Sequence, residues 1–180
     1  MSVSIKPLID AGFDLKGLKK WNSRDGGGYQ FSLVFNTKTV AEVTNDGNGG
    51  EVRIDFLSLR WDGSVWVRPD ATPAQRKKEE AQGALSAVAK AKLDEIVKAT
   101  PPVDSQWGGS PLTVDAGWLM EEMVNHAELE KVCKTKTAFR LPTDGQAQYN
   151  ILKAPFDASM RAYVLGKWPN AIILNENLFA

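Results

Sequence analysis

The chain is poor in the residues on which most site chemistry depends. Its 180 residues include one cysteine, Cys133, and one histidine, His126. A single cysteine excludes an internal disulfide and is typical of a reducing compartment. One cysteine and one histidine also exclude a zinc site of the usual Cys/His kind within one chain. The sequence therefore predicts no metal site and no cofactor.

Long hydrophobic runs are also missing, and neither charge is in excess. No apolar run approaches the roughly 20 residues that a membrane-spanning helix needs, and the first residues, MSVSIKPLIDAGFD, lack the apolar stretch of a signal peptide. We therefore expect a cytoplasmic protein with no membrane partner. The 22 basic residues balance 22 acidic ones, which argues against a DNA mimic and against a general phosphate-backbone binder.

The balanced total conceals an uneven distribution. Residues 99–130 contain six acids and no base, whereas residues 131–170 contain seven bases and two acids. Adjoining blocks of opposite charge can pair within one chain or between the two chains of a homodimer. The composition is otherwise that of a globular domain, with 43% hydrophobic and 24% charged residues.

Alternating apolar residues predict an antiparallel sheet in the N-terminal part. Strands are indicated at 29–35, 39–44 and 51–56. After Phe56 the alternation shifts by one residue, which predicts a β-bulge or a break in the strand. A meander of four or five strands over 29–68 is the expected arrangement.

The dipeptide Asp62-Gly63 is typical of a two-residue type I′ hairpin, in which both central residues have positive φ. In that register Leu59 faces Trp66, and Trp61 faces Ser64. The hairpin would provide the last two strands of the meander.

A long charged helix is predicted next, with Thr72 as its cap and Pro73 in its first turn. The first half is polar almost all round, so we expect it to project into solvent. Thr100-Pro101-Pro102 ends the helix. The packed face of the second half is predicted from three-to-four spacing, at Leu85, Val88, Ala89, Lys92, Leu93 and Ile96.

The C-terminal part reads as a helix, two strands, a helix and a short strand. The first helix is expected from Thr113, with Asp115 in its first turn; strands follow at 135–142 and 146–155, a helix at 156–167 and a buried strand near its end. The predicted fold class is therefore α+β, with an antiparallel meander, a long charged helix and a C-terminal α-β-β-α-β unit. The domains would be 1–99 and 112–180, or the two would form one single domain.

Two glycine-rich runs, NSRDGGGYQFSLVF at 22–35 and VTNDGNGGEVRIDF at 43–56, raise the question of ligand binding. The oxygen spacing of an EF-hand loop fails after Asp46. A phosphate-binding loop leads into a helix, whereas each of these runs leads into a strand. The glycines are therefore interpreted as chain reversals. The alternative that Asp25 and Asp46 together hold a ligand remains open.

Catalytic groups are scarce. His126 falls in a predicted helix with Glu122 and Glu130 four residues away on either side, where an acid can raise the histidine pKa. Cys133 has lysines nearby that can lower a thiol pKa, yet seven helical residues, roughly 10 Å, separate it from His126. No nucleophile or known catalytic motif accompanies them, so enzymatic activity is not expected.

Aromatic and basic residues provide the candidates for partner binding. Six tryptophans are present, and tryptophan dominates interface hot spots. Trp61 lies beside a hairpin tip, Trp66 close by, and Trp107 in a Gly- and Pro-rich connector. Lys134, Lys136 and Arg140 are expected on one strand face. That face is either an ordinary solvated surface or, with the bases up to 167, a surface for nucleic acid.

The stretch GGGYQFSLVFNTKTVAEVTNDGNGGEVRIDF resembles a set of small accessory proteins of bacteriophages and other mobile elements. The resemblance covers about 22–57 and consists of turn and strand residues, so it implies a context, one that includes many inhibitors of host defence, and no activity. The first hypothesis is a non-enzymatic protein that binds a host or phage protein, as a host-directed or counter-defence factor. The second is a nucleic-acid-binding accessory protein that uses the basic 131–167 face, and the third an enzyme that uses His126 or the two Asp loops.

Overall fold

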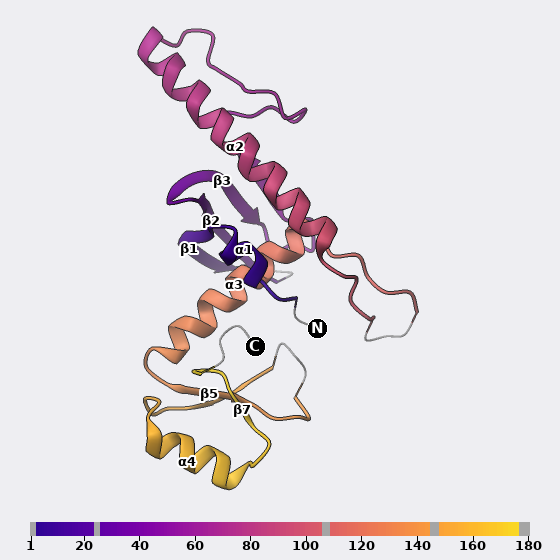
Figure 1. The fold of residues 1–180 in the computed structure, drawn as a ribbon, viewed down its shortest axis with the longest axis vertical. Coiled ribbons are helices and arrows are strands. Elements are labelled where there is room, and N and C mark those ends of the chain that lie inside the picture. Colours follow the sequence, from indigo (N-terminus) through magenta and orange to yellow (C-terminus); the bar gives the residue numbers. More distant parts are fainter. Residues whose placement is uncertain (1–2, 24–25, 106–108, 145–147, 177–180) are drawn as a thin grey trace. The chain divides into compact units, whose positions relative to one another are not determined.

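The computed structural model describes residues 3–23, 26–105, 109–144 and 148–176, and it confirms the α+β class (Figure 1). The chain divides into two compact units. We call the first the sheet unit, which comprises Lys6–Pro101 and Thr113–Met120. The second, the C-terminal unit, comprises Met1–Ile5, Pro102–Leu112 and Glu121–Ala180.

The sheet unit begins with a short helix, α1 (Lys6–Asp10), and an antiparallel meander. Its strands occur in the order β1-β2-β3-β4. They are β1 (Phe13–Asn22), β2 (Gly27–Phe35), β3 (Lys38–Asn45) and β4 (Arg53–Phe56). The meander therefore spans 13–56 rather than the predicted 29–68.

Strand β1 escaped the sequence prediction because a bulge interrupts its alternation. Its pairing with β2 shifts between Lys16 and Lys19, and Gly17 there has a φ of 68°. The extra residue moves the side chains beyond it to the opposite face, so no continuous period of two is visible. The bulge and its exposed lysines also protect this sheet edge from pairing with another strand.

One face of the sheet is apolar and the other is polar, as expected for an antiparallel sheet with one wet side. Phe31 pairs with Val43, and Leu33 with Ala41, all of them buried. On the opposite face the Ser32 hydroxyl donates to the Glu42 carboxylate at 2.9 Å. The tight turn between β2 and β3 has positive φ at both Asn36 and Thr37, 48° and 70°, the signature of a type I′ turn.

Helix α2 (Pro73–Ala99) begins and ends where the sequence predicted. Thr72 and Gln75 form a capping box, in which the Thr72 side chain accepts from the Gln75 amide and the Gln75 side chain accepts from the Thr72 amide. Side-chain amide and hydroxyl donors attach the helix to the sheet: Gln82 Nε2 donates to the Thr39 carbonyl at 3.0 Å and Ser86 Oγ to the Val40 carbonyl at 3.1 Å.

Helix α3 (Ala116–Cys133) starts three residues later than expected, with Asp115 before its first turn. The Asp115 carboxylate accepts from the Trp118 amide at 2.7 Å, which satisfies one of the free donors at the helix start. Residues up to Met120 belong to the sheet unit, and the rest of α3 to the C-terminal unit.

The C-terminal unit holds a three-stranded sheet in the order β6-β5-β7. The strands are β5 (Thr137–Arg140), β6 (Asn150–Leu152) and β7 (Ile172–Ile173), and helix α4 (Ala158–Lys167) follows its cap Asp157. The core between the strands and the helix consists of Phe139, Val164 and Ile173. The ring of Trp168 packs on that of Phe139, with their centroids 4.8 Å apart.

Candidate protein-binding surface

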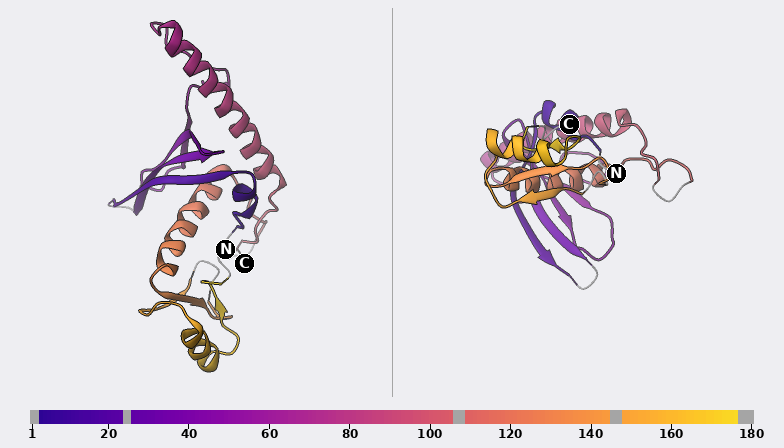
Figure 2. Two further views of the ribbon diagram at one scale, coloured as in Figure 1. Left: turned by 60° about the vertical axis from the view of Figure 1, so that its left-hand side comes forward. Right: turned by 90° about the horizontal axis from the view of Figure 1, so that it is seen from below.

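Among the described residues, the most exposed aromatic side chain is that of Trp61, on a projecting part of the sheet unit. We call residues 57–84 the tryptophan arm: the segment 57–72 followed by the first turns of α2. Figures 1 and 2 show the start of α2 extending beyond the strands, with the segment 57–72 beside it. The prediction that the first half of the helix projects into solvent is confirmed for residues 73–78, which are all exposed. At Glu79 and Gly83 the helix contacts the preceding segment.

The segment is attached to the helix by a close contact between small groups. Gly83 is buried, and a Cβ built on it would lie 2.5 Å from Val65 Cγ1 and 2.6 Å from the Ser58 carbonyl oxygen. The Trp66 amide donates to that same carbonyl at 2.8 Å. Only glycine at position 83 lets the helix and the preceding segment approach so closely.

An ion pair forms a second attachment. The Arg68 amide and Nε both donate to the Glu79 carboxylate, at 2.9 and 2.6 Å. The hydrogen bonds from the Arg68 amide and side chain lower the pKa of Glu79, and its carboxylate raises that of Arg68. Glu79 therefore stays ionised to lower pH than an ordinary glutamate, and the attachment is lost only as the pH falls through that lowered pKa.

The tip of the arm is a three-residue turn rather than the predicted two-residue one. Arg60 and Ser64 flank it: the Arg60 amide donates to the Ser64 carbonyl, and the Gly63 amide donates to the Arg60 carbonyl, both at 2.9 Å. Gly63 alone of the pair Asp62-Gly63 has positive φ, 80°, so the type I′ prediction is wrong.

The register across this turn is consequently shifted, and Leu59 pairs with Val65 rather than with Trp66. The pairing is an isolated bridge, so 57–68 adds no strand to the meander. The predicted break after Phe56 is confirmed, with Ser58 in the left-handed region at a φ of 54°.

Asp62 stabilises the turn, because its carboxylate accepts from the Ser64 amide at 2.9 Å and from the Ser64 hydroxyl at 2.7 Å. The hydroxyl bond and then the amide bond lower the pKa of Asp62. Trp61, the first residue of the turn, is 95% exposed, and Val65 and Trp66 beside it are 42% and 39% exposed. The tip thus presents one almost fully exposed indole on a hydrogen-bonded turn.

Trp107 lies outside the described residues, and the other described tryptophans are less exposed than Trp61. Trp21 on β1 covers Gly28 of the paired strand, where a side chain would collide with the indole. Trp118 is half-buried. Trp168 packs on Phe139 and carries Lys167 Nζ 4.7 Å from its ring centroid.

The expectation that three basic residues share a strand face is wrong. Strand β5 starts at Thr137, so Lys134 and Lys136 lie in the turn after α3, and only Arg140 is on the strand. Lys134 Nζ is 3.3 Å from the Glu130 carboxylate. Arg140 is half-buried, and its Nε donates to the Gln148 carbonyl at 3.3 Å.

The glycine runs connect strands, as interpreted from the sequence, and they contact each other. The Ser23 hydroxyl donates to the Gly47 carbonyl at 2.7 Å, and a Cβ on Gly47, which has a φ of 74°, would lie 2.6 Å from the Gly28 amide nitrogen. Asp46 is exposed, and Asp25 lies outside the described residues.

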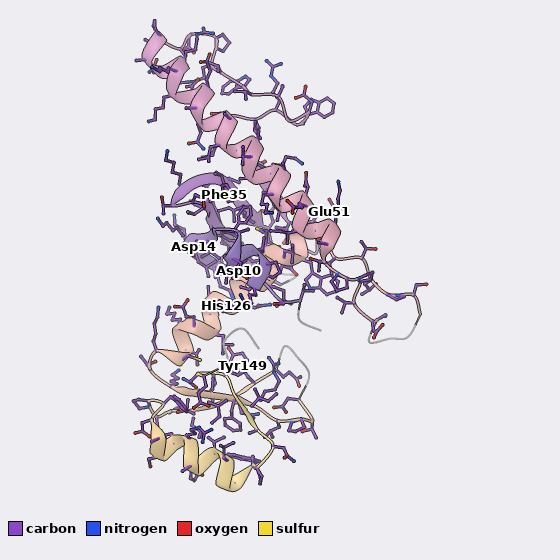
Figure 3. All side chains as sticks on the ribbon, in the orientation of Figure 1. Asp10, Asp14, Phe35, Glu51, His126 and Tyr149 are labelled. Carbon is purple, nitrogen blue, oxygen red and sulfur yellow. The ribbon has the colours of Figure 1, made fainter. Side chains whose placement is uncertain are left out.

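His126 is half-buried on α3 (Figure 3) and belongs to the C-terminal unit, whereas Asp46 belongs to the sheet unit. Burial, followed by the charge of Glu130, raises the pKa of the Cys133 thiol above its ordinary value of 9.0. The nearby lysines therefore do not activate it. Among the described residues, no group of three or more His, Cys, Asp or Glu side chains could hold a metal ion.

Within the part of the chain that the structure describes, no helix is long and apolar enough to cross a membrane. In comparisons with known proteins, no protein-family model, no curated protein and no solved structure matches the chain. The geometry of the tryptophan arm therefore carries the functional argument.

Proposed function

We propose that the protein is a non-enzymatic binding protein that inserts Trp61 into a pocket of a partner protein. The observation that carries the proposal is an indole with 95% of its surface exposed at the tip of an ordered turn. A tryptophan in this position has no role in the protein's own core. It is available for a contact with another molecule.

The arm supports binding because its conformation is set before any partner arrives. The Asp62 bonds, the Gly83–Val65 contact and the Arg68–Glu79 pair all hold the segment that presents Trp61. A preordered loop loses little conformational entropy on association. A buried tryptophan removes roughly 150–250 Å² from water, and hot-spot tryptophans contribute about 2 kcal/mol or more.

The partner is proposed to be a host protein or a phage protein, and the role that of a host-directed or counter-defence inhibitor. This narrower proposal depends on the resemblance of residues 22–57 to accessory proteins of phages and mobile elements. It predicts a binding partner in a bacterial lysate and no turnover of a substrate.

The test is affinity capture from bacterial lysate, followed by measurement of the dissociation constant with the purified captured protein. Trp61→Ala should weaken binding by about 30-fold or more, the factor that corresponds to 2 kcal/mol. Its unfolding temperature should match that of the wild type, because an exposed side chain contributes little to stability. Tyr163→Ala, which removes an exposed aromatic residue from α4, is the matched control and should bind normally. A captured protein that binds Trp61→Ala as tightly as the wild type would contradict the proposal.

The nucleic-acid alternative is less well supported, because Lys134 and Lys136 lie outside strand β5. Two of the basic residues are also in ion pairs, Lys134 with Glu130 and Arg161 with Glu176. It would require a gel shift that weakens steeply with added salt. We expect no shift at low salt.

A further inference from the structure

Helix α2 buries one face within the sheet unit. Among the described residues, nothing covers the opposite face. Gly83, Ser86, Ala89, Leu93 and Ile96 are buried. On the opposite side, six residues at alternating spacings of four and three are all exposed: Lys77, Ala81, Ala84, Val88, Ala91 and Glu95. This spacing places them in one line along the helix, over roughly 27 Å at 1.5 Å per residue.

Val88 is the one large apolar side chain in this line of residues. Sequence spacing placed it in the core beside Ala89, yet it is 59% exposed. It lies midway along the line, flanked by Ala84 and Ala91. Alanines on either side of a valine allow a second helix to approach closely, at an interaxial distance near 8 Å.

The charges at the two ends of this line indicate which partner helix fits the exposed face. The line has Lys77 at one end, within the run Arg76-Lys77-Lys78, and Glu95 at the other, next to Asp94. When this face meets a copy of itself antiparallel, with Val88 opposite Ala84, Lys77 comes opposite Glu95 at both ends. A parallel pair would instead bring lysine to lysine and glutamate to glutamate.

We propose that the protein forms a homodimer in which α2 pairs antiparallel with α2 of a second copy of this chain. The contact is isologous, so one two-fold axis near residue 86 closes it and leaves no surface for further growth. Glu95 already contacts Lys92 at 2.9 Å. That pair is exposed, so it is easily shared with an incoming lysine. The dimer does not depend on the function proposed for Trp61, which is on the segment packed against another side of α2.

The test is sedimentation velocity of the full chain at low salt, from about 1 to 300 μM, a range that covers the affinity of weak dimers. We expect a concentration-dependent dimer. Val88→Asp should raise its dissociation constant about tenfold or more, because it places a charge at the centre of the contact. Lys16→Glu, a charge reversal on exposed β1, is the control and should leave the constant unchanged.

Charge reversals test the antiparallel register. Lys77→Glu and Glu95→Lys should each weaken the dimer, and the double variant should restore it because the opposite charges meet again. In a parallel dimer neither single reversal would create a new repulsion. A wild-type chain that stays monomeric throughout the range, or a dimer indifferent to Val88→Asp and to both reversals, would overturn the proposal.

Discussion

Gly83 lies directly against Val65, on the segment that precedes the helix. The space that any larger residue would need at 83 is occupied by Val65 Cγ1 and by the Ser58 carbonyl oxygen. A helix normally loses stability through an internal glycine, by about 1 kcal/mol relative to alanine. Here the glycine permits the contact that holds the tryptophan arm together.

We therefore expect Gly83→Ala to be destabilising despite alanine's better helix propensity. The overpacking cost of about 1–3 kcal/mol should exceed the propensity gain of about 1 kcal/mol, because a backbone carbonyl has to move. Thermal unfolding monitored by circular dichroism measures the difference. The control is Gly166→Ala in α4, where a Cβ meets nothing within 4 Å, and it should be neutral or stabilising. Equal effects of the two substitutions would refute the packing argument.

Gly47 and Gly49 separate the cost of backbone conformation from the cost of space. Both have a φ of 74°, but a Cβ on Gly47 meets the backbone of residues 27 and 28, whereas one on Gly49 meets nothing within 4 Å. Gly49→Ala should lose about 1–2 kcal/mol, the cost of the left-handed conformation. Gly47→Ala should lose clearly more, because the two loops must separate. Urea unfolding of both variants checks this, and similar losses would mean that the loop contact is unimportant.

Asn175 connects three parts of the C-terminal unit. Its side chain donates to the Cys133 carbonyl at 3.1 Å and the Lys136 carbonyl at 2.8 Å, and it accepts from the Ala138 amide at 2.7 Å. Asn175→Ala should cost about 2–4 kcal/mol, because it leaves half-buried backbone groups without these partners. Asn125→Ala, at an exposed position of α3, should change the free energy of unfolding by less than about 0.5 kcal/mol. Hydrogen exchange at the Ala138 amide provides a local measurement, and unchanged protection would count against the role of Asn175.

Cys133 should behave as a poorly reactive thiol. Because burial and Glu130 raise its pKa above 9.0, the midpoint of its alkylation rate against pH should lie above that value. Glu130→Gln should move the midpoint down. The folded state keeps the thiol proton to higher pH than the unfolded chain does. Raising the pH from the ordinary pKa of 9.0 to the raised pKa of the folded state therefore lowers the free energy of unfolding. A midpoint below 9 would show that the lysines nearby dominate after all.

Much of the fold could be predicted because its signals are local. Alternation identified β2 and β3, and the Thr72-Pro73 start together with the Thr100-Pro101 stop located α2 within a residue. Strand β1 was missed because its bulge at Gly17 breaks the alternation. The Asp62-Gly63 turn was given the wrong type because the dipeptide also suits a three-residue turn whose last residue alone needs positive φ.

The candidate surface was only partly predictable. Trp61 was singled out from its place beside a turn, and its side chain is exposed in the structure. Its support could not be predicted, because the contact of Gly83 with Val65 and the pair between Arg68 and Glu79 join residues far apart in sequence. Lys134 and Lys136 were misplaced because their alternation continues into β5, although the strand itself begins only at Thr137.

The division of α3 between the two units affects how the protein can be cut. Thr113–Met120 belongs with residues 6–101, and its Val114, Leu119 and Met120 side chains are buried. A fragment ending at the Pro101-Pro102 pair would lack this segment, and Val52, which lies against Gly117, would become exposed. A chain shortened within the proline-rich connector would therefore be prone to aggregate. Expression boundaries for the N-terminal part are better placed beyond residue 120.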